Sequence, residues 1–317
     1  MNRREFIVSA SAAALAGCTN GRVGSSIPPC RRPRFHVFSK MFQPPVTASP
    51  EALCDLLASA GCDGVQWTVR KGGHVTPENV ASELPRLVKV AQSRDLACES
   101  ICTGIVDGDD PTADAICRIA ADCGVRQFRA GYCFYDEKRE SFAQSMDRFR
   151  RVFASLARLG ERTGVKAAYQ NHSTWGPAVF GGVVWDIYEC VKDLDPRHIG
   201  IEYDPMHAFH ETGESWRHGA ALVAPWVSAI DLKDFHYRPD GKNPKRTKKT
   251  MVAAGEGIVP WGEVKRIVAA SGIDPFYIVH FEYDFDKADL AKTVKEELSA
   301  FRRNLCYNDN LQGEGTK

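Results

Sequence analysis

The segment IGIEYDPMH (residues 199–207) joins a short apolar strand to a group of polar residues at its carboxyl end. Residues 199–203 form the strand, which is rich in β-branched and aromatic side chains. Glu202, Asp204 and His207 lie at its end or just beyond it. Ionisable residues at the carboxyl ends of strands are typical of the active face of a closed parallel barrel. The segment therefore indicates both a fold and the place of a site.

The same unit recurs along the chain, because apolar strands alternate with amphipathic helices for eight rounds. The predicted strands are residues 35–39, 64–69, 97–103, 127–132, 166–172, 199–203, 228–232 and 276–281. The predicted helices include residues 50–60, 77–94, 112–123, 141–163, 183–194, 261–271 and 287–303. Neither a linker nor a glycine-rich dinucleotide-binding turn interrupts the series. This pattern favours an α/β fold with one (β/α)8 barrel domain over a doubly wound sheet.

The first residues predict an export signal. Arg3 and Arg4 precede a short apolar run over residues 6–17, as in twin-arginine signals, and LAGC (residues 15–18) fits a lipoprotein box that ends at Cys18. We therefore expect a signal at residues 1–18, a flexible tether at 19–33, the barrel at 34–306 and a disordered tail at 307–317. The protein is expected to be periplasmic and attached to the membrane only through a lipid on Cys18.

The charge of the chain is nearly balanced, with 41 Lys and Arg against 40 Asp and Glu. This balance argues against a nucleic-acid partner and favours a small, neutral or weakly charged ligand. The 11 cysteines show no C-x-x-C pair and no regular spacing, so no particular disulfide is predicted. Residues 237–257 are rich in Lys, Arg, Gly and Pro and are expected to form an irregular loop. That loop is either solvated or clamps an anionic substrate or a neighbouring protomer, so a homo-oligomer stays open.

Polar and ionisable side chains gather at the ends of successive strands, which predicts a pocket at the barrel mouth. From the fifth strand onward they are Gln170, Asn171, His172, Glu202, Asp204, His207, Asp231, Lys233, Asp234, His236, His280 and Glu282. Arg129 on the fourth strand, and His36 and Lys40 near the first, are further candidates. Aromatic residues that follow strand ends, such as Trp175, could stack on the apolar face of a sugar ring.

This series resembles the xylose-isomerase-like TIM-barrel superfamily of sugar phosphate isomerases and epimerases, over essentially all of the chain after the signal. The runs YQNH (169–172), KDF (233–235) and HFEY (280–283) look like an exported, twin-arginine branch of it. The resemblance implies a divalent metal held by Glu, Asp, His and Glu at four strand ends. Asp204 and Glu282 match two of these ligands, and His207 matches the histidine that contacts the substrate. Gln170 and Asp231 stand where the family has Glu and His.

These two departures bear on the chemistry. Gln170 cannot accept a proton, so Glu282 is the preferred base, and His207, His172 or Lys233 could be the acid or the group that stabilises an enolate oxygen. An ion pair of Lys233 with Asp234 or Asp204 is the structural alternative. Mn, Mg or Ca would suit the oxygen-rich set better than Zn. The predicted metal ligands are Asp204, Asp231, Glu282 and Gln170, and the predicted substrate-binding residues are His172, Trp175, Arg129, His236 and Glu256.

Three functions follow from these residues. The first is an isomerase or epimerase that moves a proton next to a sugar carbonyl, with one carboxylate base favouring a one-base shuttle such as aldose–ketose isomerisation. The second is a lyase or hydratase that acts on 3-keto sugars or glycosides. The third is a lipid-anchored barrel that binds carbohydrate without catalysis, with Gln170 as the sign of lost chemistry. In each case the expected partner is a small carbohydrate.

Overall fold

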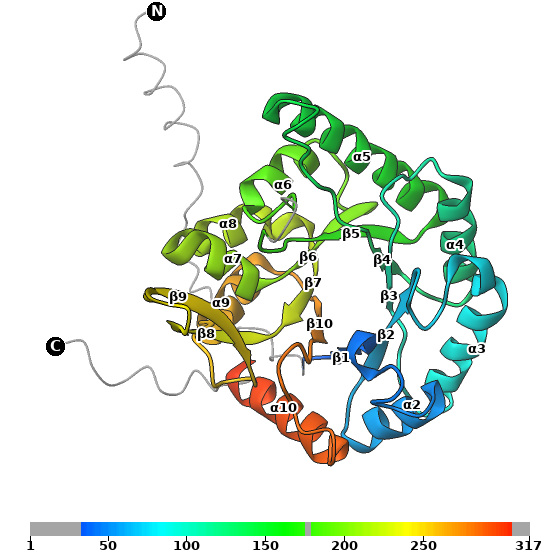
Figure 1. Cartoon of the computed structure of the whole chain (residues 1–317). Coiled ribbons are helices and arrows are strands. Elements are labelled where there is room, and N and C mark those ends of the chain that lie inside the picture. The colour runs from blue at the N-terminus through cyan, green and yellow to red at the C-terminus, as the bar shows by residue number, and fades with distance from the viewer. Residues whose placement is uncertain (1–32, 175–178, 306–317) are drawn as a thin grey trace, which may run out of the picture. The chain divides into compact units, whose positions relative to one another are not determined.

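A closed barrel of eight parallel strands forms the centre of the protein. The computed structural model describes residues 33–174 and 179–305. The strand order is β1-β10-β7-β6-β5-β4-β3-β2, and helices surround the barrel (Figure 1). The prediction of a single (β/α)8 barrel is confirmed. The predicted signal, Cys18 and nearly all of the tether and the tail lie outside the described residues.

The barrel strands are short and buried. They are β1 (Phe35–Phe38), β2 (Gly64–Val69), β3 (Ser100–Thr103), β4 (Gln127–Arg129), β5 (Lys166–Gln170), β6 (Ile199–Tyr203), β7 (Val227–Leu232) and β10 (Phe276–Val279). The barrel closes at β1, where His36 pairs in register with Gly64 of β2 and with Ile278 of β10. All the carboxyl ends therefore meet on one face of the barrel.

Helices follow the strands and cover the outside of the barrel (Figure 1). They are α2 (Pro50–Ser59), α3 (Val80–Gln92), α4 (Pro111–Asp122), α5 (Phe142–Thr163), α6 (Val184–Val191), α7 (Pro205–Thr212), α8 (Trp216–Val223), α9 (Trp261–Ser271) and α10 (Leu290–Leu305). Short 3-10 turns are η1 (Ser39–Phe42), η2 (Pro77–Asn79), η3 (Gly213–Ser215) and η4 (Ala224–Trp226). Among the described helices, none has the length and apolar character needed to cross a membrane.

Local sequence signals set the helix ends. The side chain of Ser141 caps α5 and forms a capping box with Gln144, and Gly164 ends the helix in the left-handed conformation. Asp204 caps α7, because its carboxylate accepts a hydrogen bond from the backbone N–H of His207 at 3.0 Å. The cap ties the carboxyl end of β6 directly to a helix at the mouth.

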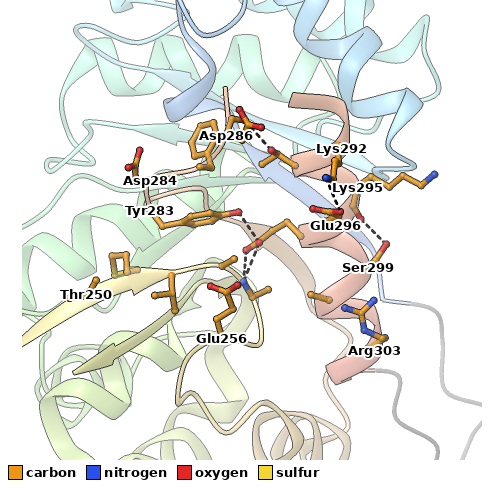
Figure 2. A pocket seen from close by; sticks show the side chains of 18 of the residues that line it. Thr250, Glu256, Tyr283, Asp284, Asp286, Lys292, Lys295, Glu296, Ser299 and Arg303 are labelled. Carbon is orange, nitrogen blue, oxygen red and sulfur yellow. Dashed lines mark hydrogen bonds and ion pairs between the residues drawn. The ribbon is translucent and has the colours of Figure 1, made fainter. Parts of the chain in front are cut away.

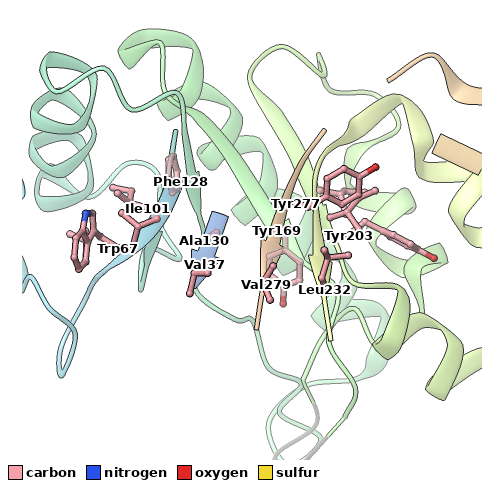
Figure 3. Packing of buried hydrophobic residues seen from close by; sticks show 14 of the residues in the cluster. Val37, Trp67, Ile101, Phe128, Ala130, Tyr169, Tyr203, Leu232, Tyr277 and Val279 are labelled. Atoms are coloured by element: carbon pink, nitrogen blue, oxygen red, sulfur yellow. The ribbon is translucent and has the colours of Figure 1, made fainter. Parts of the chain in front are cut away.

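Alternate residues of each strand face two different apolar layers. On β10, Tyr277 and Val279 belong to the large layer between strands and helices, which also contains Trp67 and Phe128 (Figure 3). The intervening residues belong to a small cluster inside the barrel, made of Phe38, Cys102, Ala229, Phe276 and Ile278. Nearer the carboxyl ends, buried polar side chains such as Glu202 and Asp231 accompany this cluster.

The basic stretch after β7 is ordered as an antiparallel hairpin, so the predicted irregular loop over residues 237–257 is wrong. Strands β8 (Asp234–Asp240) and β9 (Asn243–Val252) pair along their length. The Asp234 carboxylate accepts hydrogen bonds from the backbone N–H groups of Gly255, Gly257 and Val259 at 3.1–3.3 Å. A side chain at position 257 would collide with Asp234, so glycine is required there. This fastening holds the base of the hairpin beside the barrel mouth.

Candidate active site

A buried ammonium group lies at the centre of the barrel mouth. Lys233, directly after β7, places Nζ 3.0 Å from Asp204 Oδ2 and 3.1 Å from Glu282 Oε2. Lys233 and Asp204 are buried, whereas Glu282 keeps 22% of its side chain exposed. Burial alone would lower the pKa of Lys233, but Asp204 and Glu282 raise it above its usual value. Lys233 is therefore a permanent cation.

Glu282 lies at the rim of this group. Burial works to raise the pKa of Glu282, but Lys233 and His280 hold it well below its ordinary value. Its second oxygen, Oε1, is 3.1 Å from Nζ of Lys40 on η1. Glu282 is thus ionised, partly exposed to solvent and flanked by two lysines.

Gln170 links the two aspartates at the mouth. Its Nε2 donates to Asp204 Oδ2 at 3.1 Å and also to Asp231 Oδ2, while its Oε1 accepts a hydrogen bond from the Tyr132 hydroxyl. The amide is therefore fully engaged as a hydrogen-bonding bridge. As the sequence predicts, it offers no basic group at the end of β5.

Two histidines stack at one side of the mouth. The rings of His172 and His207 have centroids 3.7 Å apart, and His207 Nδ1 is 2.6 Å from Ser173 Oγ. Burial, reinforced by Lys233, lowers the pKa of His172 to about 3 and that of His207 well below its ordinary value. Both rings are thus neutral at pH 7. A neutral imidazole can still donate a hydrogen bond to a developing oxyanion.

The hairpin reaches the same side of the mouth. Lys249 of β9 donates from Nζ to Ser173 Oγ at 3.1 Å, and Tyr237 of β8 lies 2.8 Å from His210 of α7 through its hydroxyl. Burial lowers the pKa of Lys249, although Asp204 partly opposes this. The hairpin therefore covers the histidine side and leaves the Glu282 side more open.

A second polar layer lies deeper in the barrel. On β6 it begins two residues before Asp204, and at the end of β10 two residues before Glu282. Glu202, Asp231 and His280 are all buried there. His280 Nε2 is 3.2 Å from Asp231 Oδ1, and Glu202 accepts a hydrogen bond from Gln66 at 3.1 Å. Within the described residues, these three form the one His/Cys/Asp/Glu group whose ligand atoms all lie within 4.8 Å of one another. Burial and Asp231 raise the pKa of Glu202 to about 8.

The structure brings most of the predicted site residues together. Asp204, Asp231, Glu282, Gln170, Lys233, His207 and His172 all belong to the mouth network. Arg129 lies lower, 3.4 Å from Glu202 and over the ring of Phe38. Lys40 joins through Glu282, but His36 does not, because its ring faces Glu99 at 3.3 Å near the amino-terminal ends of the strands. The prediction that His36 lies at the mouth is wrong.

Two of the predicted substrate-binding residues lie elsewhere. His236 is part of the hairpin, where its ring accepts a hydrogen bond from Arg238 at 2.6 Å. Glu256 lines a surface cavity of about 1060 Å³ between the hairpin base and α10 (Figure 2). Trp175 lies outside the described residues. Their roles in binding stay predictions.

The four predicted metal ligands do not fit a divalent cation in this arrangement. Lys233 already places a positive charge between Asp204 and Glu282, and Gln170 turns its N–H₂ group, not its oxygen, toward both aspartates. A metal ion would need oxygen lone pairs where these donors point.

Sequence and structure comparisons agree on the fold. Residues 54–304 match the family described as xylose isomerase-like TIM barrel. No curated protein matches the chain significantly. The structure is similar to the IOLI protein with a binding zinc atom, at 14% identity and a TM-score of 0.66, covering 86% of this chain and 99% of that one.

Two sugar epimerases are also structurally similar. The first is the D-psicose 3-epimerase of Clostridium cellulolyticum H10, at 12% identity, 86% and 99% coverage and a TM-score of 0.63. The second is the 3-keto-D-glucoside 4-epimerase of E. coli, at 12% identity, 85% and 98% coverage and a TM-score of 0.63. At such identities the likeness establishes the barrel alone.

Proposed function

Because the chain belongs to the xylose isomerase-like TIM barrel family, we propose that it is an enzyme that moves a proton next to the carbonyl group of a carbohydrate. One observation carries the proposal. Glu282 is an ionised, partly exposed carboxylate that touches a buried ammonium, Lys233, at the carboxyl end of the barrel. The carboxylate can accept the proton, and the ammonium beside it can stabilise the negative charge that develops on the carbonyl oxygen.

The residues divide the work as follows. Glu282 accepts the proton from the carbon next to the carbonyl, and the electron pair left on that carbon moves onto the carbonyl oxygen. Lys233 stabilises this oxygen by charge, and the neutral ring of His207 donates a hydrogen bond. Among the described residues, His207 Nε2 has no hydrogen-bond partner, which leaves it available for that purpose. Glu282 then returns the proton.

Isomerisation is the first candidate for the complete reaction. Two-base epimerisation needs a second basic group opposite the first, and the end of β5 carries the amide of Gln170 instead. The aldose–ketose exchange is completed when Glu282 gives this proton to the former carbonyl carbon, while the proton of the neighbouring hydroxyl group moves to the former carbonyl oxygen. The second candidate is elimination from a 3-keto sugar or glycoside, in which the proton taken up by Glu282 leaves with the departing hydroxyl group as water and the N–H of His207 donates a hydrogen bond to that group.

The place of action is also a proposal. The twin-arginine signal, the lipid on Cys18 and a periplasmic location rest on residues 1–32, which the structure does not describe. A homo-oligomer likewise stays a prediction. A periplasmic enzyme would meet free sugars and glycosides, so these form the first substrate panel.

The test is mass spectrometry of keto sugars, aldoses and 3-keto glycosides after incubation with the protein in D2O. Gain of one deuterium by a substrate and its isomer supports isomerisation, whereas loss of water supports elimination. Glu282→Gln should lower either rate by about 100-fold or more, because proton transfer by a positioned side chain contributes about that much. Glu189→Gln, at a partly exposed position on α6 outside the mouth network, is the matched control. Binding of a sugar without exchange or elimination would overturn the proposal in favour of a non-catalytic barrel.

A further inference from the structure

We propose that Glu202, Asp231 and His280 bind one divalent transition-metal ion in the barrel interior, below the network of Lys233. The three residues come from β6, β7 and the end of β10, which are neighbouring strands in the barrel. Each strand thus contributes one inward-facing ligand. This site is different from the four predicted ligands, with which it shares Asp231 alone.

The distances suit a shared ion. His280 Nε2 and Asp231 Oδ1 are 3.2 Å apart, and the candidate ligand atoms of all three residues lie within 4.8 Å of one another. Two ligands that bind the same ion at about 2.0–2.2 Å each are separated by roughly 3 Å when they are adjacent. The imidazole and the carboxylate therefore already stand at a spacing that one ion can bridge.

Unsatisfied atoms point to the same place. Within the described part of the chain, His280 Nδ1 has no hydrogen-bond partner, and His280 Nε2 and Asp231 Oδ1 face one another at 3.2 Å, although both side chains are at least 99% buried. Buried polar atoms without partners are rare in native proteins and call for an explanation such as a bound ion. An ion bound by both Nε2 and Oδ1 would replace this single contact with two metal–ligand bonds.

The surrounding hydrogen bonds hold the carboxylates in place. Gln66 donates to Glu202 Oε2 at 3.1 Å, and Gln170 donates to the other oxygen of Asp231. Outer partners of this kind orient metal ligands and raise the affinity for metal. In this role the amide of Gln170 serves the deeper site instead of ligating an ion itself.

The ligand types favour zinc or a similar ion. Imidazole nitrogen suits Zn²⁺ and its neighbours in the transition series, whereas Mg²⁺ and Ca²⁺ prefer an all-oxygen set. The sequence-based preference for Mn, Mg or Ca came from four residues that include no histidine. His280 changes that preference.

X-ray absorption spectroscopy of the folded protein loaded with Zn²⁺ separates the two sites. The proposed site predicts one imidazole in the coordination shell and one equivalent of zinc that a chelator removes slowly, because the ligands are buried. A zinc shell of oxygen ligands without imidazole, or no stoichiometric zinc, would overturn the proposal. Since this readout involves no substrate, its failure leaves the proposed proton transfer untouched.

Variants give an independent readout by calorimetric titration with Zn²⁺. His280→Gln and Glu202→Gln should weaken zinc binding by about 100-fold or more, whereas Asp204→Asn and Glu282→Gln should change it less than about 10-fold. Zinc should also raise the melting temperature of the unmodified protein and not that of His280→Gln. The reverse ranking of the variants would assign the ion to the four mouth residues and refute the deeper site. If His280→Gln does not fold, the absorption spectrum of the unmodified protein still decides.

Discussion

Replacement of Lys233 by Met tests the buried cation at the centre of the mouth. Lys233 Nζ lies 3.0 Å from Asp204 Oδ2 and 3.1 Å from Glu282 Oε2. At an effective dielectric constant of about 20, each contact supplies roughly 5 kcal/mol of Coulomb attraction, most of which the desolvation of the charges offsets. Methionine has a similar length but leaves Asp204 buried beside no ammonium. We therefore expect the free energy of unfolding to fall by about 3–5 kcal/mol at pH 8.

The loss should depend on pH. Burial raises the pKa of Asp204 even while Lys233 is present, and removal of the ammonium should raise that pKa further. A carboxyl whose pKa is higher in the folded than in the unfolded state binds its proton preferentially in the folded state. Its contribution to stability therefore declines as the pH rises. Lys233→Met should lose more stability at pH 8 than at pH 5.

Urea unfolding followed by tryptophan fluorescence at both pH values measures this loss. The matched control is Lys192→Met, because Lys192 pairs with Glu189 at the surface and should contribute less than about 1 kcal/mol. The double variant Lys233→Met/Asp204→Asn should recover part of the stability, since the orphaned charge is gone. A loss below about 1 kcal/mol for Lys233→Met, or an equal loss at both pH values, would refute the buried ion pair.

Two further predictions exchange a carboxyl group and an amide at the buried positions 297 and 170. Burial raises the pKa of Glu297 on α10 to about 7, despite hydrogen bonds from Ala254 and Tyr283. The folded state therefore holds this proton more tightly than the unfolded state does, and the free energy of unfolding falls as the pH rises from about 4.5 to 7. Glu297→Gln should therefore gain about 3 kcal/mol relative to the unmodified protein between pH 4.5 and 8 in urea unfolding, and an unchanged difference would contradict this. Gln170→Glu adds a carboxylate beside two buried aspartates, so its unfolding free energy should fall by about 3 kcal/mol at pH 8. Its deuterium-exchange rate should not rise, because Glu282 alone is the base; a large increase would indicate a two-base enzyme.

The fold could be predicted because the hydrophobic pattern changes period at each element. Strands 64–69 and 199–203 and helix 261–271 have the predicted ends. Other predicted strands run too far, as 166–172 does past Gln170, because extended polar residues after a strand resemble the strand itself. The sequence pattern does not predict the hairpin, because its many charged residues hide the alternation of apolar and polar side chains that is typical of a strand. The Asp240–Gly241 pair at its tip was the available turn signal.

The gathering of the site was predictable, but its pairings were not. Parallel strands bring their carboxyl ends together, so Asp204, Asp231 and Glu282 had to converge. The sequence offered Asp234 or Asp204 as the partner of Lys233. In the structure Lys233 binds Asp204 and Glu282, while Asp234 turns to the backbone of the hairpin base. Which oxygen a lysine reaches depends on tertiary geometry that no spacing encodes.

The sequence carries a signal for the deeper layer. Side chains two residues apart on a strand face the same side. Glu202 therefore shares a face with Asp204, and His280 shares one with Glu282. Both residues lie at predicted strand ends, but the family resemblance assigns roles to the positions two residues later.

The proposed reaction requires that Glu282 removes a proton next to a carbohydrate carbonyl. The most direct test is the position of deuterium in substrate that is recovered after incubation in D2O. NMR spectroscopy should locate the deuterium at the carbon that neighbours the carbonyl, and Glu282→Gln should leave that carbon unlabelled. Label that enters equally with Glu282→Gln would show that this carboxylate is not the base.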